Sequence, residues 1–309
     1  MFCPSSGTVP DFAFCTKCER SMLRLARIGT KATLFAAVLL AVVVLGSGRV
    51  KAAPQKQSET YVQPMARDEL NEGVSAFKNG KFPDAVKHFK QAVALDPDNP
   101  VALLYLATAY MSQWIPGAGT PENADMANKA QGGFLKVLEE DPANKTALAS
   151  LASLTYNEAS SLPPGQKLAK LDEAANWYMK LVEADPKNKV AYYSMGVIAW
   201  TKWYPADMAA RANLHMRPAD PGPIKDEKVK KELKAQYSSI IEDGIANLQR
   251  ALDIDKEYDD AMAYMNLLIR ERADLSDTPE EYNQQVEVAN SWLKKALDTK
   301  KLKQSRTPR

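Results

Sequence analysis

The sequence has few of the residues on which enzymes and metal sites depend. Its three cysteines, Cys3, Cys15 and Cys18, lie near the start, so the rest of the chain has no thiol for a disulfide, a nucleophile or a metal. Cys15 and Cys18 have the spacing of half a zinc site, but a structural zinc ion needs four ligands. The only histidines are His88 and His215, and no glycine-rich phosphate loop or nucleophile-elbow motif occurs. These absences predict a protein that is not an enzyme and uses no cofactor or metal.

An excess of charge of one sign is also missing. The chain has 40 basic and 38 acidic residues, which gives a formal net charge of +2. Such a balance supplies no long-range field to attract nucleic acid, so nucleic-acid binding is not expected. A basic run closes the chain, and residues 301–309 are predicted to be a disordered, solvated tail.

A basic and then apolar segment near the N-terminus indicates export. Three basic residues between positions 24 and 31 precede an apolar run from Ala32 to Leu45, and the small residue Ala52 follows. The run of about 14 residues suits the core of a signal peptide better than a membrane span, which needs roughly 20. We therefore predict a leader and signal peptide over 1–53, a linker over 54–63, and a periplasmic or envelope location for the body.

A retained membrane anchor is the alternative interpretation. Arg49 and Lys51 precede the predicted cut, where positive charge is unusual in a cleaved signal. Residues 32–48 would then remain as an N-terminal helix in the inner membrane. Met22 opens a more ordinary signal than Met1 does, and is a candidate for the true start. Both interpretations place the body outside the cytoplasm.

The rest of the chain is built from repeats. The segments at 96–99, 141–144 and 185–188 all read Asp-Pro-x-Asn, and a fourth, starting at Asp255, has lysine in place of proline. Ahead of the first segment, Ala85, Phe89 and Ala92 share one helical face. Small residues on such a face let two helices approach closely while the ring fills the gap, and the proline stops the second helix.

The unit from Ala66 to Asn99 is 34 residues long and resembles a tetratricopeptide repeat (TPR). The residues that carry the resemblance are Gly73, Gly80, Phe82, Ala85, Phe89, Ala92 and Pro97. The resemblance implies an all-α, right-handed superhelical solenoid of antiparallel helix pairs, with about five units and insertions. The expected units within a domain over 64–300 are 66–99, 100–144, 145–188, 189–258 (with a long insert over 202–234) and 259–299.

The same resemblance implies where a partner protein or peptide binds. In this family the first helix of each unit lines a concave groove, and its contact positions fall here on Met111, Tyr156, Asn157, Tyr193, Trp200 and Arg270. The insert adds Trp203 and Tyr204, in a segment over 203–224 that we expect to be a long loop which covers the groove or contacts the partner. The predicted function is a non-enzymatic interaction scaffold in the bacterial envelope. The alternatives are a membrane-anchored assembly factor and, less favoured, a small-molecule receptor with the insert as a lid.

The export hypothesis is tested by the mature N-terminus. Mass spectrometry of the protein recovered from envelope fractions should find a chain that begins near Ala53, because signal peptidase cuts after a small residue. A chain that keeps residues 32–48 and fractionates with membranes would instead establish the anchored form.

Overall fold

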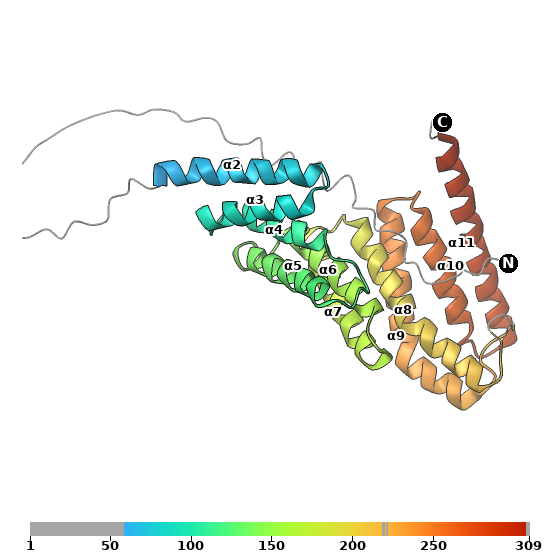
Figure 1. The fold of residues 1–309 in the computed structure, drawn as a ribbon. Coiled ribbons are helices and arrows are strands. Elements are labelled where there is room, and N and C mark those ends of the chain that lie inside the picture. The colour runs from blue at the N-terminus through green and yellow to red at the C-terminus, as the bar shows by residue number, and fades with distance from the viewer. Residues whose placement is uncertain (1–58, 218–219, 221, 307–309) are drawn as a thin grey trace, which may run out of the picture. The chain divides into compact units, whose positions relative to one another are not determined.

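The computed structural model describes residues 59–217, 220 and 222–306, and every regular element among them is an α-helix (Figure 1). The helices are α2 (Glu59–Lys78), α3 (Phe82–Leu95), α4 (Pro100–Met111), α5 (Pro121–Glu140), α6 (Lys145–Ser160), α7 (Pro164–Ala184), α8 (Lys189–Asn213), α9 (Glu227–Ile254), α10 (Asp259–Ala273) and α11 (Pro279–Arg306).

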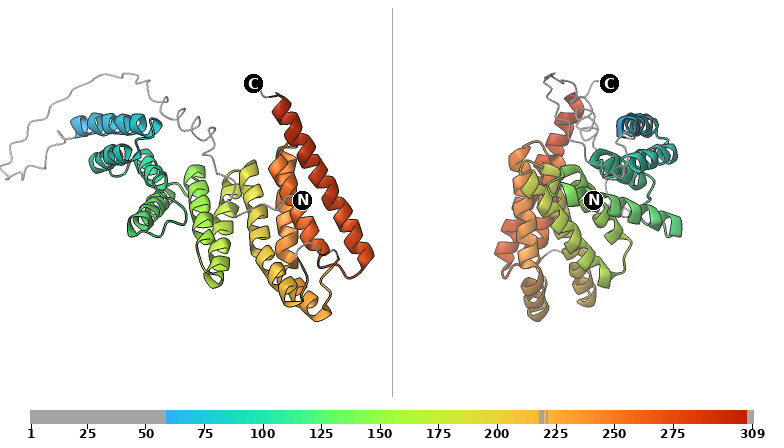
Figure 2. Two further views of the ribbon diagram at one scale, coloured as in Figure 1. Left: turned by 45° about the vertical axis from the view of Figure 1, so that its right-hand side comes forward. Right: turned by 90° about the vertical axis from the view of Figure 1, so that its left-hand side faces the viewer.

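The helices form five consecutive pairs, from α2–α3 to α10–α11. Each helix packs most extensively against its pair partner, and each pair packs next against the pair that follows it in the chain, as the two views of Figure 2 show. This arrangement confirms the predicted all-α solenoid of helix pairs.

The Asp-Pro-x-Asn segments are the junctions between pairs. The side chains of Asn99, Asn144 and Asn188 cap the helices that follow, by accepting hydrogen bonds from backbone N–H groups of the first turn. The fourth junction lacks both the proline and the asparagine, yet α9 still ends at Ile254. There the carboxylate of Asp255 accepts a hydrogen bond from the Glu257 N–H at 2.9 Å and so stabilises the turn.

The small and aromatic positions of the repeat form the core. Ala85, Phe89, Ala92, Ala107, Ala130, Phe134, Ala152, Ala174, Tyr178 and Ala251 are all at most 3% exposed. On the first helix of the last pair, Met262, Met265 and Ile269 are buried as the pattern predicts. The period of the sequence therefore identified the residues that hold each pair together.

The adjacent glycines of α5 have different surroundings. A Cβ added at Gly133 would lie 2.7 Å from the Cβ of Ala107 on α4, whereas a Cβ at Gly132 would meet nothing within 4 Å. Gly133 is thus required by the close approach of α4 and α5. Gly132 has no such role and only lowers the intrinsic stability of its helix.

The prediction of a long loop over 203–224 is wrong for its first half. Helix α8 runs through Pro205 to Asn213 because one face of this stretch is buried at every turn, with Trp203 0% exposed. The helix ends in a Schellman motif, in which the Met216 N–H donates to the Arg211 carbonyl at 2.8 Å. His215 has the positive φ of 53° that this motif requires.

Both predicted flexible ends of the domain are also partly helical. Helix α2 begins at Glu59, within the expected linker, and α11 continues to Arg306, within the expected tail. The tail residues are fixed by ion pairs, Lys303 with Asp259 and Arg306 with Glu257. The predicted leader, signal or anchor over 1–53 lies outside the described residues. None of the helices α2 to α11 combines the length and the hydrophobicity that a membrane span requires.

The two glycines of α5 provide a matched pair of variants. Gly133→Ala should destabilise the protein by about 1–2 kcal/mol, because the new methyl group overlaps Ala107. Gly132→Ala should stabilise it by up to about 1 kcal/mol, because alanine favours the helix and meets no neighbour. Urea unfolding followed by far-UV circular dichroism measures both. If the two variants changed stability in the same direction, the proposed tight contact would be wrong.

Candidate functional site

The residues predicted to bind a partner fall into distinct environments. Tyr193 and Trp203 are buried, Trp200 is half-buried, and Tyr204 is 37% exposed. Trp203 is the clear correction: with no exposed surface, it belongs to the core between α8, α9 and α10 and not to a contact surface. The insert that carries it therefore contributes one accessible aromatic side chain of the predicted two.

Five aromatic side chains form a continuous series across α8 and α10, which we call the aromatic ladder: Tyr258, Tyr193, Tyr264, Trp200 and Tyr204. Successive ring centroids in this order lie 5.1, 5.5, 5.9 and 4.8 Å apart. The series becomes more accessible from Tyr193, which is 7% exposed, to the stacked pair of Trp200 and Tyr204 at its end. Each ring is thus held in place by its neighbour, and the ladder presents a rigid apolar edge.

The tyrosines of this region keep their protons. Burial raises the pKa of Tyr264 to about 12 and raises the pKa of Tyr193 as well. Burial also raises the pKa of Tyr156, which is 8% exposed on α6, although a hydrogen bond with Thr201 opposes the shift. Neutral hydroxyl groups leave this partly desolvated aromatic region without buried phenolate charge.

The other predicted contact residues are not part of the ladder. Met111, on α4, packs against a separate apolar cluster around Phe134. The Arg270 guanidinium donates a hydrogen bond to Asn290 Oδ1 at 2.7 Å and so joins α10 to α11. Asn157 is half-buried on α6. The structure thus brings together Tyr193, Trp200 and Tyr204, and leaves Met111 apart from them.

A cluster of charged groups lies next to the ladder, between α8 and the end of α10. The Arg211 guanidinium bridges two carboxylates, with its Nε 3.1 Å from Asp207 Oδ2 and an Nη 2.5 Å from Asp274 Oδ1. The Trp203 indole N–H donates to Glu271 Oε2 at 2.6 Å. One oxygen from each of Asp207, Glu271 and Asp274 lies within 4.8 Å of the others. We call these three residues the carboxylate cluster.

Burial dominates the titration of this cluster. It raises the pKa of Glu271 to about 8, with a further increase from the nearby charge of Asp207. Burial raises the pKa of Asp274 to about 6, even though the Arg211 guanidinium acts in the opposite direction. The pKa of Asp207 is raised for the same reason. Burial outweighs the effect of the nearby guanidinium groups, so the native protein holds a proton on Glu271 at neutral pH.

Reading the sequence missed Tyr258, Tyr264 and the carboxylate cluster. Glu271 follows Arg270 and occupies a contact position of the repeat register, the one that Asn157 occupies in the third unit. The repeat register could therefore have identified Glu271 as a candidate site residue. Asp207 could not be found in this way, because the segment that contains it was expected to be a loop.

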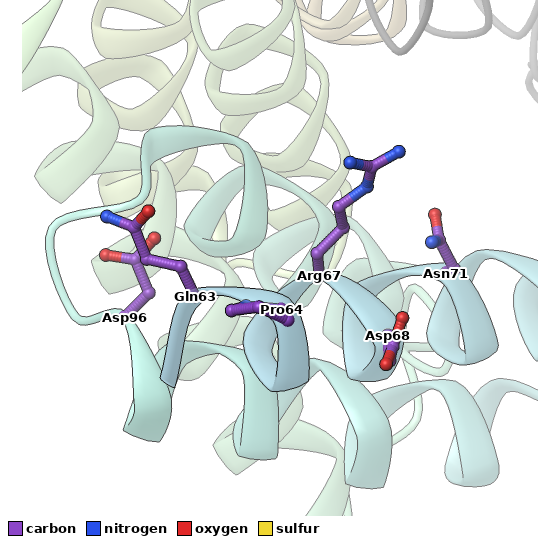
Figure 3. A pocket seen from close by; sticks show the side chains of 6 residues that line it. All are labelled: Gln63, Pro64, Arg67, Asp68, Asn71 and Asp96. Atoms are coloured by element: carbon purple, nitrogen blue, oxygen red, sulfur yellow. The ribbon is translucent and has the colours of Figure 1, made fainter. Parts of the chain in front are cut away.

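A polar pocket lies at the other end of the domain, along α2 (Figure 3). It has a volume of about 720 Å³ and is lined by Gln63, Pro64, Arg67, Asp68, Asn71 and Asp96. All of these residues except Asp96 are exposed, so the pocket is open to solvent and offers a ligand little desolvated surface.

Comparison with known proteins gives one family match. The model of the TPR repeat matches residues 74–113, which run from the end of α2 to just past the end of α4. No curated protein matched the sequence.

Several solved structures are similar over most of their length. A crystal structure of MamA protein is 15% identical, covers 79% of this chain and 97% of its own, and gives a TM-score of 0.46. MamA from Desulfovibrio magneticus is 18% identical, with 79% and 98% covered and a TM-score of 0.48. A thermophilic TPR protein from Thermus thermophilus is 15% identical, with 78% and 97% covered and a TM-score of 0.41. Identities and scores this low transfer no function to this chain.

The raised pKa of Glu271 predicts how stability depends on pH. This carboxyl ionises near pH 4.5 in the unfolded chain and near pH 8 in the native one, so between these values the native state holds more protons and stability falls as pH rises. Asp274 acts in the same direction below about pH 6. Glu271→Gln cannot ionise and should flatten the decline in melting temperature from about pH 5 to about pH 8 in chelator-treated buffer.

The control for this measurement is Glu242→Gln, at an exposed glutamate of α9. The melting temperature of this variant should fall with rising pH as steeply as that of the parent protein. An unchanged slope in Glu271→Gln would mean that Glu271 titrates normally in the native state.

Proposed function

We propose that this chain, whose residues 74–113 match the model of the tetratricopeptide repeat, is a non-enzymatic scaffold of the bacterial cell envelope that binds a segment of a partner protein along the aromatic ladder. Repeat arrays of stacked helix pairs present extended binding surfaces, and the first helix of each pair lines that surface. The ladder belongs to such first helices, α8 and α10, except for Tyr258, which precedes α10 directly.

The single observation that carries the proposal is the stack of Trp200 on Tyr204 at the accessible end of the ladder. Tryptophan and tyrosine supply large apolar contact areas with few rotatable bonds, and they dominate the energetic centres of protein interfaces. Buried Tyr193 and half-buried Tyr264 hold the Trp200 ring from behind, so little conformational entropy remains to be lost when a partner binds.

The charged and polar groups around the ladder support binding over catalysis. His88 lies on α3 against Glu69, 2.7 Å from its carboxylate, and His215 ends α8, so neither accompanies the ladder. Glu271 is held by Trp203, and Asp207 and Asp274 are held by Arg211. These groups are fixed by partners of their own, which favours a positioning role over proton transfer to a substrate.

The envelope part of the proposal rests on the basic and apolar segment over 24–52, which predicts export. A membrane-anchored assembly factor is the second candidate, because Arg49 and Lys51 suit an anchor that is not removed. The aromatic ladder serves the same purpose in both, and the mature N-terminus separates them.

Site-specific photo-crosslinking in the native envelope tests the ladder as a binding surface. A benzophenone amino acid replaces Tyr204 in one variant and Gln249, an exposed residue of α9, in the matched control. We expect one dominant protein to be captured from position 204 and not from position 249. Tyr204→Ala should weaken binding of the captured protein about tenfold, with the helical spectrum unchanged. Equal capture at both positions, or none at position 204, would contradict the proposal.

A further inference from the structure

The carboxylate cluster brings three acidic groups together from separate parts of the chain. Asp207 lies on α8, Glu271 on the last turn of α10, and Asp274 directly after that helix. Asp207 is 1% and Asp274 9% exposed, while Glu271 is half-buried. Side chains of this kind are rarely buried together without compensation, because removing a carboxylate from water is costly. From the geometry below, we propose that Asp207, Glu271 and Asp274 bind one calcium-sized divalent cation.

The distances between the carboxylates fit one such ion. One oxygen of each carboxylate lies within 4.8 Å of the other two. Calcium binds oxygen at about 2.3–2.6 Å, so two oxygens on opposite sides of one ion are about 4.8 Å apart and other pairs are closer. The three oxygens can therefore reach a common ion with side-chain adjustment alone.

When its three carboxyl groups are ionised, the cluster has more negative than positive charge. Three carboxylates face a single guanidinium, that of Arg211, which is paired with Asp207 and Asp274. With all three acids ionised the sum is −2, equal and opposite to the charge of a divalent cation. A further cation, Arg270 on α10, acts on Asp274 from a greater distance, and its hydrogen bond to the neutral amide of Asn290 leaves its charge in place. A divalent cation would therefore balance the carboxylates and the one guanidinium that is in direct contact with them.

An unpartnered oxygen points independently to a ligand. Asp207 Oδ1 is buried and has no hydrogen-bond partner, although Oδ2 of the same carboxylate accepts from Arg211. A buried carboxylate oxygen without a donor is strongly unfavourable and rare in native proteins. A cation shared with Glu271 and Asp274 gives this oxygen a partner.

The donor set determines the class of cation. All three ligands are carboxylates, with neither histidine nor cysteine among them, and hard oxygen donors favour calcium, magnesium or manganese over zinc or copper. Glu271 supplies the accessible side of the site, where water can complete the coordination shell. Its Oε2 accepts a hydrogen bond from Trp203, which fixes the carboxylate in the way that groups around metal ligands commonly do.

The site would join the fourth helix pair to the fifth beneath the aromatic ladder. Trp203 contacts the cluster, and Trp200 lies close enough to Glu271 to favour its ionised form, although its indole N–H makes no hydrogen bond of normal geometry. The inference stands apart from partner binding, since it needs only the residues of α8 and α10. Bound cation would stiffen the contact between these two helices.

Terbium luminescence tests the site on the purified full-length chain. Terbium replaces calcium on carboxylate ligands and emits when a neighbouring indole is excited. The Trp203 indole is hydrogen-bonded to Glu271 and therefore lies next to the proposed site. After treatment with chelator, we expect saturable emission that calcium displaces. We also expect calcium to raise the melting temperature by about 5 °C at about 100 times its Kd.

Glu271→Gln is the diagnostic variant, because the amide keeps the size of the side chain and an oxygen that can accept from Trp203. Calcium binding, measured by titration calorimetry, should weaken about tenfold or more in this variant, with the helical spectrum retained. Glu242→Gln, at an exposed glutamate of α9, should bind like the parent. Absence of saturable emission, failure of calcium to displace terbium, or equal binding by Glu271→Gln and the parent would each overturn the proposal.

Discussion

Close contact between the two helices of each pair is the constraint on which this structure depends. The helices meet at residues with little or no side chain, such as Gly133 against Ala107 and Gly244 against Ala199, where an added Cβ would lie 2.7 and 2.5 Å from the opposing methyl group. At that separation the neighbouring aromatic rings, for example Phe134, fill the remaining space. Close pairs of this kind stack one after another along the chain, and capped junctions such as Asn144 fix where each new helix begins.

Stacking of pairs then places side chains from separate helices in contact. The aromatic ladder contains rings from α8 and rings from the start and middle of α10, which only become neighbours when the fourth and fifth pairs pack. Its accessible end, Trp200 on Tyr204, is supported by buried Tyr193 through Tyr264. The surface that we propose for partner binding is thus a product of the interface between pairs, and its rigidity follows from the same packing.

The C-terminal part of α8, residues 203–213, contributes charged groups to this interface. Arg211 joins Asp207 to Asp274, and the Ile224 N–H donates to the Asp274 carbonyl at 2.9 Å, so the segment after α8 is tied to the end of α10. Burying three carboxyl groups with one guanidinium raises their pKa values and leaves Asp207 Oδ1 without a partner. Without metal, a proton on Glu271 reduces the charge of this cluster, and the proposed cation would take its place and give Asp207 Oδ1 a partner.

Local spacing in the sequence was enough to predict the helix pairs, their junctions and most of their core: small residues and Phe89 lie on one helical face, and Asp-Pro-x-Asn marks the turns. It did not determine the course of 203–213, since Pro205 and the polar residues around it favoured a loop, and burial of Trp203 outweighed that local preference. Nor could it separate Tyr204, which stays accessible, from Trp203 one position away. These points, and the proximity of Asp207 to Glu271 and Asp274, follow from how the helix pairs stack. Contacts between residues far apart in the sequence cannot be predicted from a local repeat.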